Sequence, residues 1–152
     1  MITLRFVAHP GLFNWACRIA QYGLWPTHCD AVLPDGRLLG SRFVGGVQAR
    51  SALYDAGDFT RELRVRIIST QAQEDAFYAF LNDQLDKPFD SLAIIAFITG
   101  RDWQAPDSWF CSELQAAALV ATGLFPNHMA VGFNHISVRD LLLLASTLTE
   151  GD

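Results

Sequence analysis

Residues 27–40 read THCDAVLPDGRLLG. Apolar residues flank a turn-forming group from Pro34 to Arg37, and an Asp-Gly pair in such a setting is a strong signal for a β-hairpin. The pattern predicts a strand over residues 27–33, a turn, and a returning strand over residues 38–44. We expect the rest of the fold to be arranged around this hairpin.

The segments around the hairpin predict more strands first and helices later. Strands are expected at 2–8, 47–52 and 60–69, and helices at 10–22, 70–85, 91–99, 111–122 and 137–148. The chain has no internal repeat and no linker rich in Gly or Ser, so we expect one domain over residues 1–152. This order of elements predicts an α+β fold, with a small antiparallel sheet packed against helices.

The composition limits the class of protein. The chain has 152 residues, of which 51% are hydrophobic and 18% charged, as in compact globular proteins. A net charge of −5 and scattered basic residues argue against a nucleic-acid partner.

The most apolar run, residues 92–99, is far shorter than the roughly 20 residues that span a bilayer. Arg5, His9 and Arg18 interrupt any signal peptide. The default expectation is therefore a cytoplasmic protein, although association with a phage or another export route would fit the sequence equally well.

The three cysteines do not form a recognisable framework. Cys17, Cys29 and Cys111 are odd in number and have no spacing typical of zinc ligands, so we expect neither a metal nor another cofactor. Cys17 and Cys29 are expected to be small buried side chains. A redox-sensing role for Cys111 is not favoured, because no second cysteine stands at a recognisable spacing from it.

Cys111 is the candidate nucleophile. It lies in the stretch WFCSEL and is expected on the first turn of a helix that ends at Gly123. Ser108 or Phe110 can cap this helix. If Phe110 is the cap, Glu113 is the third helical residue and can bond back to the cap N–H. Unpaired N–H groups and the helix dipole at such a position stabilise a thiolate.

A cysteine nucleophile needs a base within hydrogen-bond reach. Of the four histidines, His9 is expected at a surface turn, and His128 and His135 are expected in a loop. His28 opens a strand whose backbone would hold the ring in place, which makes it the candidate base. The alternative is a half-buried strand histidine that bonds a backbone carbonyl.

Ser41 is the first candidate for the group that orients this base. If Asp35 and Gly36 form a two-residue turn, Asp30 lies opposite Ser41. Ser41 is then on the same face of the sheet as His28, one diagonal step away. In this register Gly40 points to the other face and contributes nothing to the site.

Two other residues remain alternatives for the orienting group. Asp30 lies two residues along the strand of His28 and shares its face. Gln48 becomes a candidate if Gly45 and Gly46 form a bulge that shifts the following stretch.

Three segments resemble motifs of a known family. Residues 27–40 look like the histidine hairpin of the circularly permuted papain-like amidases, which are the YaeF/YiiX-like relatives of NlpC-type cell-wall peptidases. Residues 109–114 resemble the nucleophile motif of this family, an aromatic pair followed by Cys-Ser-Glu-Leu. Residues 87–90 resemble its Pro-Tyr-Asp segment. The histidine hairpin precedes the cysteine helix, as the permutation requires, and the resemblance covers roughly residues 2–145.

The resemblance implies a permuted papain-like, NlpC-type fold, with a small antiparallel sheet or half-barrel packed against helices. It assigns Cys111 as nucleophile and His28 as base. This chain departs from the family at Gly40 and Ser41, where many relatives carry a larger polar residue, and at Phe89, which replaces the tyrosine.

The expected activity is that of a cysteine hydrolase, an amidase or peptidase that works through an acyl-enzyme. The expected partner is a small peptide, amide or acyl substrate, such as a peptidoglycan peptide or a lipid-linked amide. An acyltransferase would use the same residues. The alternative is a catalytically weak or inactive papain-like module that serves in a phage or operon assembly.

Overall fold

The computed structural model describes residues 1–11, 14–15, 18–19, 23, 25–90, 107–124 and 136–149. In these ranges the strands are β1 (Ile2–Ala8), β2 (His28–Val32), β3 (Leu38–Arg42), β4 (Gly46–Arg50) and β5 (Arg61–Ile67). The helices are α2 (Gln71–Asp83), α4 (Cys111–Ala121) and α5 (Val138–Ser146). The helices expected at 10–22 and 91–99, together with Cys17, His128 and His135, lie wholly or largely outside the described residues.

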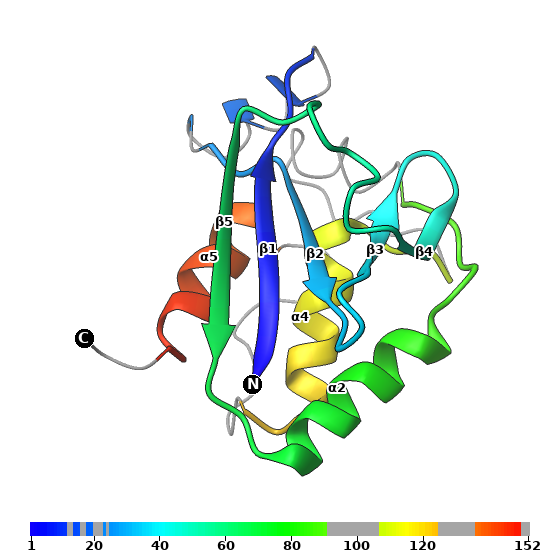
Figure 1. Cartoon of the computed structure of the whole chain (residues 1–152), viewed down its shortest axis with the longest axis vertical. Coiled ribbons are helices and arrows are strands. Elements are labelled where there is room, and N and C mark those ends of the chain that lie inside the picture. Colours follow the sequence, from blue (N-terminus) through cyan, green and yellow to red (C-terminus); the bar gives the residue numbers. More distant parts are fainter. Residues whose placement is uncertain are drawn as a thin grey trace.

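The strands form one antiparallel sheet in the order β4-β3-β2-β1-β5. Helix α4 contacts β2 and β3, α5 contacts β1 and β5, and α2 packs against α4. Figure 1 shows these helices on one side of the sheet. The expected α+β architecture, an antiparallel sheet packed against helices, is confirmed.

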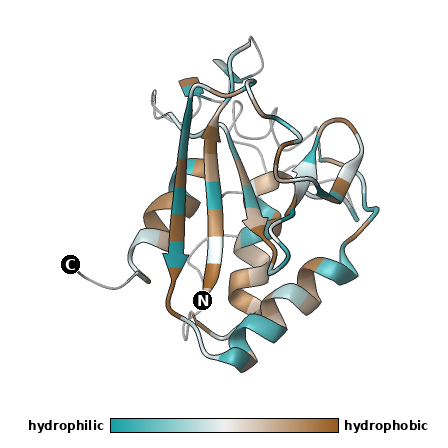
Figure 2. Cartoon of the chain, viewed as in Figure 1, coloured by the Kyte–Doolittle hydropathy of each residue, from teal (hydrophilic) through white to brown (hydrophobic). Residues whose placement is uncertain are grey.

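Alternation along the strands separates an apolar face from a polar one. On β1, Leu4 and Phe6 are fully buried in the core beneath the helices, while Arg5 points to the opposite face. Helix α4 is buried along almost its whole length, residues 111–119, because it lies between the sheet and α2. Figure 2 shows the resulting contrast between the apolar α4 and the more polar α2.

Local sequence signals place the helix ends as expected. Thr70 caps α2 and bonds Gln73, and Ser137 caps α5 and bonds Asp140. Gly123 follows α4 with a φ of +72°, a conformation that glycine adopts without strain. None of the helices in the described ranges is long and apolar enough to cross a membrane.

The β2–β3 hairpin differs from the expected register by one residue. Val32 pairs with Leu38, and the N–H of Leu33 bonds the carbonyl of Arg37, so three residues form the turn instead of two. Gly36, with a φ of +85°, takes the left-handed position that such a turn requires. Because side chains alternate, this shift moves every residue of the returning strand to the other face.

Strands β2 and β3 separate soon after the turn. Their described pairing covers two residues of each strand, whereas β3 pairs with β4 along its whole length. Figure 1 shows β3 diverging from β2 toward the end of the sheet where His28 lies. The candidate site is at this end.

Candidate active site

Cys111 is the first residue of α4 and is 2% exposed. Phe110 caps the helix, and its N–H donates to Oε2 of Glu113 at 2.9 Å. Of the two caps that the sequence left open, the structure therefore uses Phe110. The first N–H groups of a helix have no intrahelical partner, so this position favours a negative charge on the sulfur.

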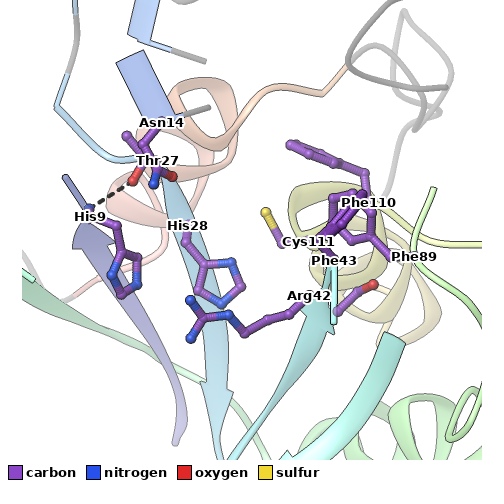
Figure 3. Close-up of a pocket in the computed structure, with 10 residues that line it drawn as sticks. His9, Asn14, Thr27, His28, Arg42, Phe43, Phe89, Phe110 and Cys111 are labelled. Carbon is purple, nitrogen blue, oxygen red and sulfur yellow. Dashed lines mark hydrogen bonds between the residues drawn. The ribbon is translucent and has the colours of Figure 1, made fainter. Parts of the chain in front are cut away.

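His28, the first residue of β2, lies beside Cys111. Figure 3 shows the sulfur on the side of Cys111 nearer to His28, and both residues line the same pocket. Burial alone would raise the pKa of Cys111, but hydrogen bonds with Cys29 and His28 and the charge of His28 lower it to about 5. Burial alone would lower the pKa of His28, but the charge and hydrogen bond of Asp30, together with Cys111, raise it to about 9. These opposite shifts favour a thiolate–imidazolium pair between the two values.

Asp30 is the group that orients the imidazole. Its Oδ1 lies 3.0 Å from Nε2 of His28, and its Oδ2 accepts a hydrogen bond of 2.8 Å from the hydroxyl of Tyr54. Burial would raise the pKa of Asp30, but the charge and hydrogen bond of His28 lower it, so Asp30 is a carboxylate. Because Nε2 faces Asp30, Nδ1 is the ring nitrogen left to face Cys111.

The register that placed Ser41 beside His28 is wrong. Ser41 lines the pocket, but its hydroxyl donates to the carbonyl of Trp109 at 2.6 Å and makes no hydrogen bond with the imidazole. Gln48, the other alternative, is exposed and pairs across the sheet with Gly40. Among the three candidates, only Asp30 contacts the base.

Gly40 makes room for this carboxylate. A Cβ built on Gly40 would lie 2.2 Å from Oδ1 of Asp30, which is closer than real Cβ atoms approach other atoms. The sequence led us to expect that Gly40 points away from the site. The one-residue shift of the hairpin instead turns this position toward Asp30, so the lack of a side chain is what allows Asp30 to reach His28.

A buried ionic network behind Asp30 was not predicted. The guanidinium of Arg5 makes two hydrogen bonds to Asp55, of 2.9 and 3.0 Å, and one of 3.0 Å to Glu62. Its Nη1 also lies 3.7 Å from Oδ2 of Asp30. The signal in the sequence is Arg5 itself, since an arginine inside the apolar strand ITLRFVA needs a buried partner.

His9 and Cys29 are closer to the site than expected. His9 is 9% exposed, lines the pocket, and has its ring centroid 6.0 Å from that of His28, so the predicted surface location is wrong. Cys29 is buried as expected, but its thiol also lies close enough to Cys111 to help lower the pKa of that thiol. Spacing along the sequence did not reveal this contact between two cysteines.

The site opens into a pocket of about 120 Å³. Its wall includes three phenylalanine rings in successive contact, with centroids 5.9 Å apart for Phe43 and Phe89 and 5.6 Å apart for Phe89 and Phe110. The reacting groups therefore face a small cavity that is lined in part by apolar rings (Figure 3).

Comparisons with known proteins add no further assignment. The sequence matches no protein-family model, and no curated protein matches it. Within the described ranges, no group of three or more His, Cys, Asp or Glu side chains is arranged to hold a metal ion. The chemistry of this site therefore rests on its own residues.

Proposed function

We propose that this protein is a cysteine hydrolase, an amidase or peptidase, in which Cys111 is the nucleophile and His28 the general base. Asp30 is the positioning residue that holds the imidazole. One observation carries the proposal: the ring of His28 lies between a thiol at a helix start and a buried carboxylate. A nucleophile, a base and a third group that orients the base form the arrangement that acyl transfer requires.

The proposed reaction begins with attack of the Cys111 thiolate on an amide carbonyl. A C–S bond forms, and the backbone N–H of Cys111 at the start of α4 stabilises the oxyanion. The imidazolium of His28 then gives its Nδ1 proton to the leaving amine as the C–N bond breaks. In the second half, His28 takes a proton from water, the resulting hydroxide attacks the thioester, and the acid leaves with the thiolate restored.

The resemblance to circularly permuted papain-like amidases supports the same proposal. The antiparallel sheet packed against helices and the order of the two motifs are compatible with that fold, and we propose it for this chain. The family's polar position falls on Gly40 and Ser41 here. In our proposal Asp30 replaces that group from the neighbouring strand, in the space that Gly40 leaves open.

The alkylation of Cys111 at pH 6 tests the proposal. We expect iodoacetamide to label Cys111 selectively, because an ordinary thiol is almost fully protonated at this pH. His28→Ala should suppress the labelling, and Cys111→Ala should abolish it. Mass spectrometry after a brief reaction with an activated ester should then show an acyl group on Cys111. Slow and equal labelling of Cys29 and Cys111 would exclude the enzyme and favour a binding or structural module instead.

A further inference from the structure

Arg42 places a positive charge in the wall of the candidate active-site pocket. It is the last residue of β3 and lines the same pocket as Cys111 and His28. Its guanidinium lies 4.8 Å over the ring of Tyr54, whose hydroxyl is held by Asp30. Stacking on a fixed ring positions the guanidinium while its N–H donors stay available.

No carboxylate in the described part of the chain forms an ion pair with Arg42. Arg5, by contrast, is paired with Asp55 and Glu62. The titratable neighbours of Arg42 in the pocket include His9 and His28. The pKa of His9 is lowered, first by burial and also by the charges of His28 and Arg42. A half-buried guanidinium that forms no ion pair with any described carboxylate suits an anionic ligand.

The apolar and cationic parts of the pocket lie at opposite ends. Figure 3 shows Phe89 and Phe110 on the Cys111 side of the pocket, while the guanidinium of Arg42 extends to the side of His28. The reacting pair is therefore placed between a wall that suits an apolar group and a wall that suits an anion.

The order of bond breaking and proton transfer decides which part of the substrate lies at each end of the pocket. His28 must protonate the leaving amine, so the leaving group lies over His28, and the acyl group lies on the other side of the sulfur. Arg42 is on the leaving-group side. We propose that Arg42 is a carboxylate-binding subsite that selects amides whose leaving group is an α-amino acid with a free carboxylate.

Arg42, His28 and Cys111 line one pocket of only about 120 Å³, so an anion bound by Arg42 lies within a few atoms of the amine that His28 protonates. An α-amino acid is the simplest leaving group of this kind, because a single carbon separates its amine from its carboxylate. The phenylalanine wall then accepts an apolar acyl group or apolar side chain on the other side of the scissile bond. An N-acyl amino acid and the C-terminal residue of a peptide share this chemistry. This inference rests on the proposed function, since it uses His28 as the proton donor.

Protection of Cys111 from alkylation tests the subsite without requiring turnover. The probes are phenylacetyl-L-alanine and phenylacetyl-L-alaninamide, which differ only in the charged carboxylate. We expect the free acid to slow iodoacetamide labelling at about 10- to 100-fold lower concentration than the carboxamide, as a charge-assisted bond to arginine implies. Arg42→Gln should remove this preference. Arg37→Gln, a surface variant whose guanidinium pairs with Asp35, is the matched control and should keep it.

Equal protection by both probes, or an unchanged preference in Arg42→Gln, would overturn the subsite while leaving a reactive Cys111 in place. Unselective labelling of the ligand-free protein would instead overturn the proposed function. Release of phenylacetate from the free acid and release of alanine from a peptide that ends in alanine are the two turnover assays for the substrate class. The ratio of the two rates identifies which class of substrate the pocket prefers.

Discussion

Replacing Gly40 with alanine should weaken the base His28 indirectly, through Asp30. The backbone of Gly40 is not left-handed, so alanine fits its conformation, but the new Cβ would meet Oδ1 of Asp30 at 2.2 Å. Asp30 is 1% exposed, and a contact this short forces its carboxylate to shift, so we expect it to leave the 3.0 Å contact with His28. The largest influence that raises the pKa of His28 is then lost.

The size of the effect follows from the pKa values. Asp30 is the main reason that the pKa of His28 is about 9 instead of 6.5. Its loss should move the pKa of His28 down toward the ordinary value of 6.5. Because the helix start and Cys29 still stabilise the thiolate, we expect only part of this loss at Cys111, whose pKa should rise from about 5 toward the ordinary range of a thiol. A rise of about two pKa units would lower the thiolate fraction at pH 6 about tenfold.

The assay is the rate of Cys111 alkylation between pH 4 and pH 9, followed by mass spectrometry. Gly40→Ala should label about tenfold more slowly at pH 6 and equally fast at high pH. Asp30→Asn should behave in the same way and covers the case in which Gly40→Ala does not fold. Ser41→Ala, one residue along the strand, is the matched control and should keep the wild-type profile. A cooperatively folded Gly40→Ala protein with wild-type labelling at pH 6 would refute the role of Asp30.

Two further predictions concern titration. Hydrolysis should have a bell-shaped pH profile for kcat/KM, because Cys111 becomes protonated below about pH 5 and His28 loses the proton for the leaving group above about pH 9; a single rise near the ordinary thiol pKa would contradict this. Burial, together with the charges of Asp90 and Cys111, raises the pKa of Glu113 to about 7, so the folded protein binds more protons than the unfolded one between the ordinary pKa of 4.5 and 7. Wild-type stability should therefore fall across this interval, on the order of 1–3 kcal/mol relative to Glu113→Gln, as measured by urea unfolding at pH 5 and pH 8; a constant difference would exclude this titration.

Features set by neighbouring residues were predictable from the sequence. The caps at Thr70 and Ser137 and the position of Cys111 at a helix start depend on residues three or four positions apart. The alternation in β1 depends only on burial of one face. Each of these features could be read locally because a single short-range interaction decides it.

The hairpin register was less predictable because Pro34-Asp35-Gly36-Arg37 is compatible with two turn lengths. Gly36 can occupy the left-handed position of a three-residue turn as well as the second position of a two-residue turn. Choosing the shorter turn moved Ser41 into the site and Gly40 out of it. The network of Arg5 with Asp55 was missed for a different reason, since residues 50 positions apart meet only in the folded chain.

The register also explains why the orienting group comes from the strand of the base itself. A partner on β3 would depend on pairing between β2 and β3, but the described pairing of these strands stops at Ala31 and Leu39, before it reaches His28. Asp30 avoids this dependence because residues two apart in a strand share a face whatever the neighbouring strand does. The neighbouring strand then needs only to leave space for the carboxylate, and Gly40 leaves this space because it has no side chain. The separation of β2 from β3 thus leaves the geometry of the base intact while Cys111 approaches His28 at this end of the sheet.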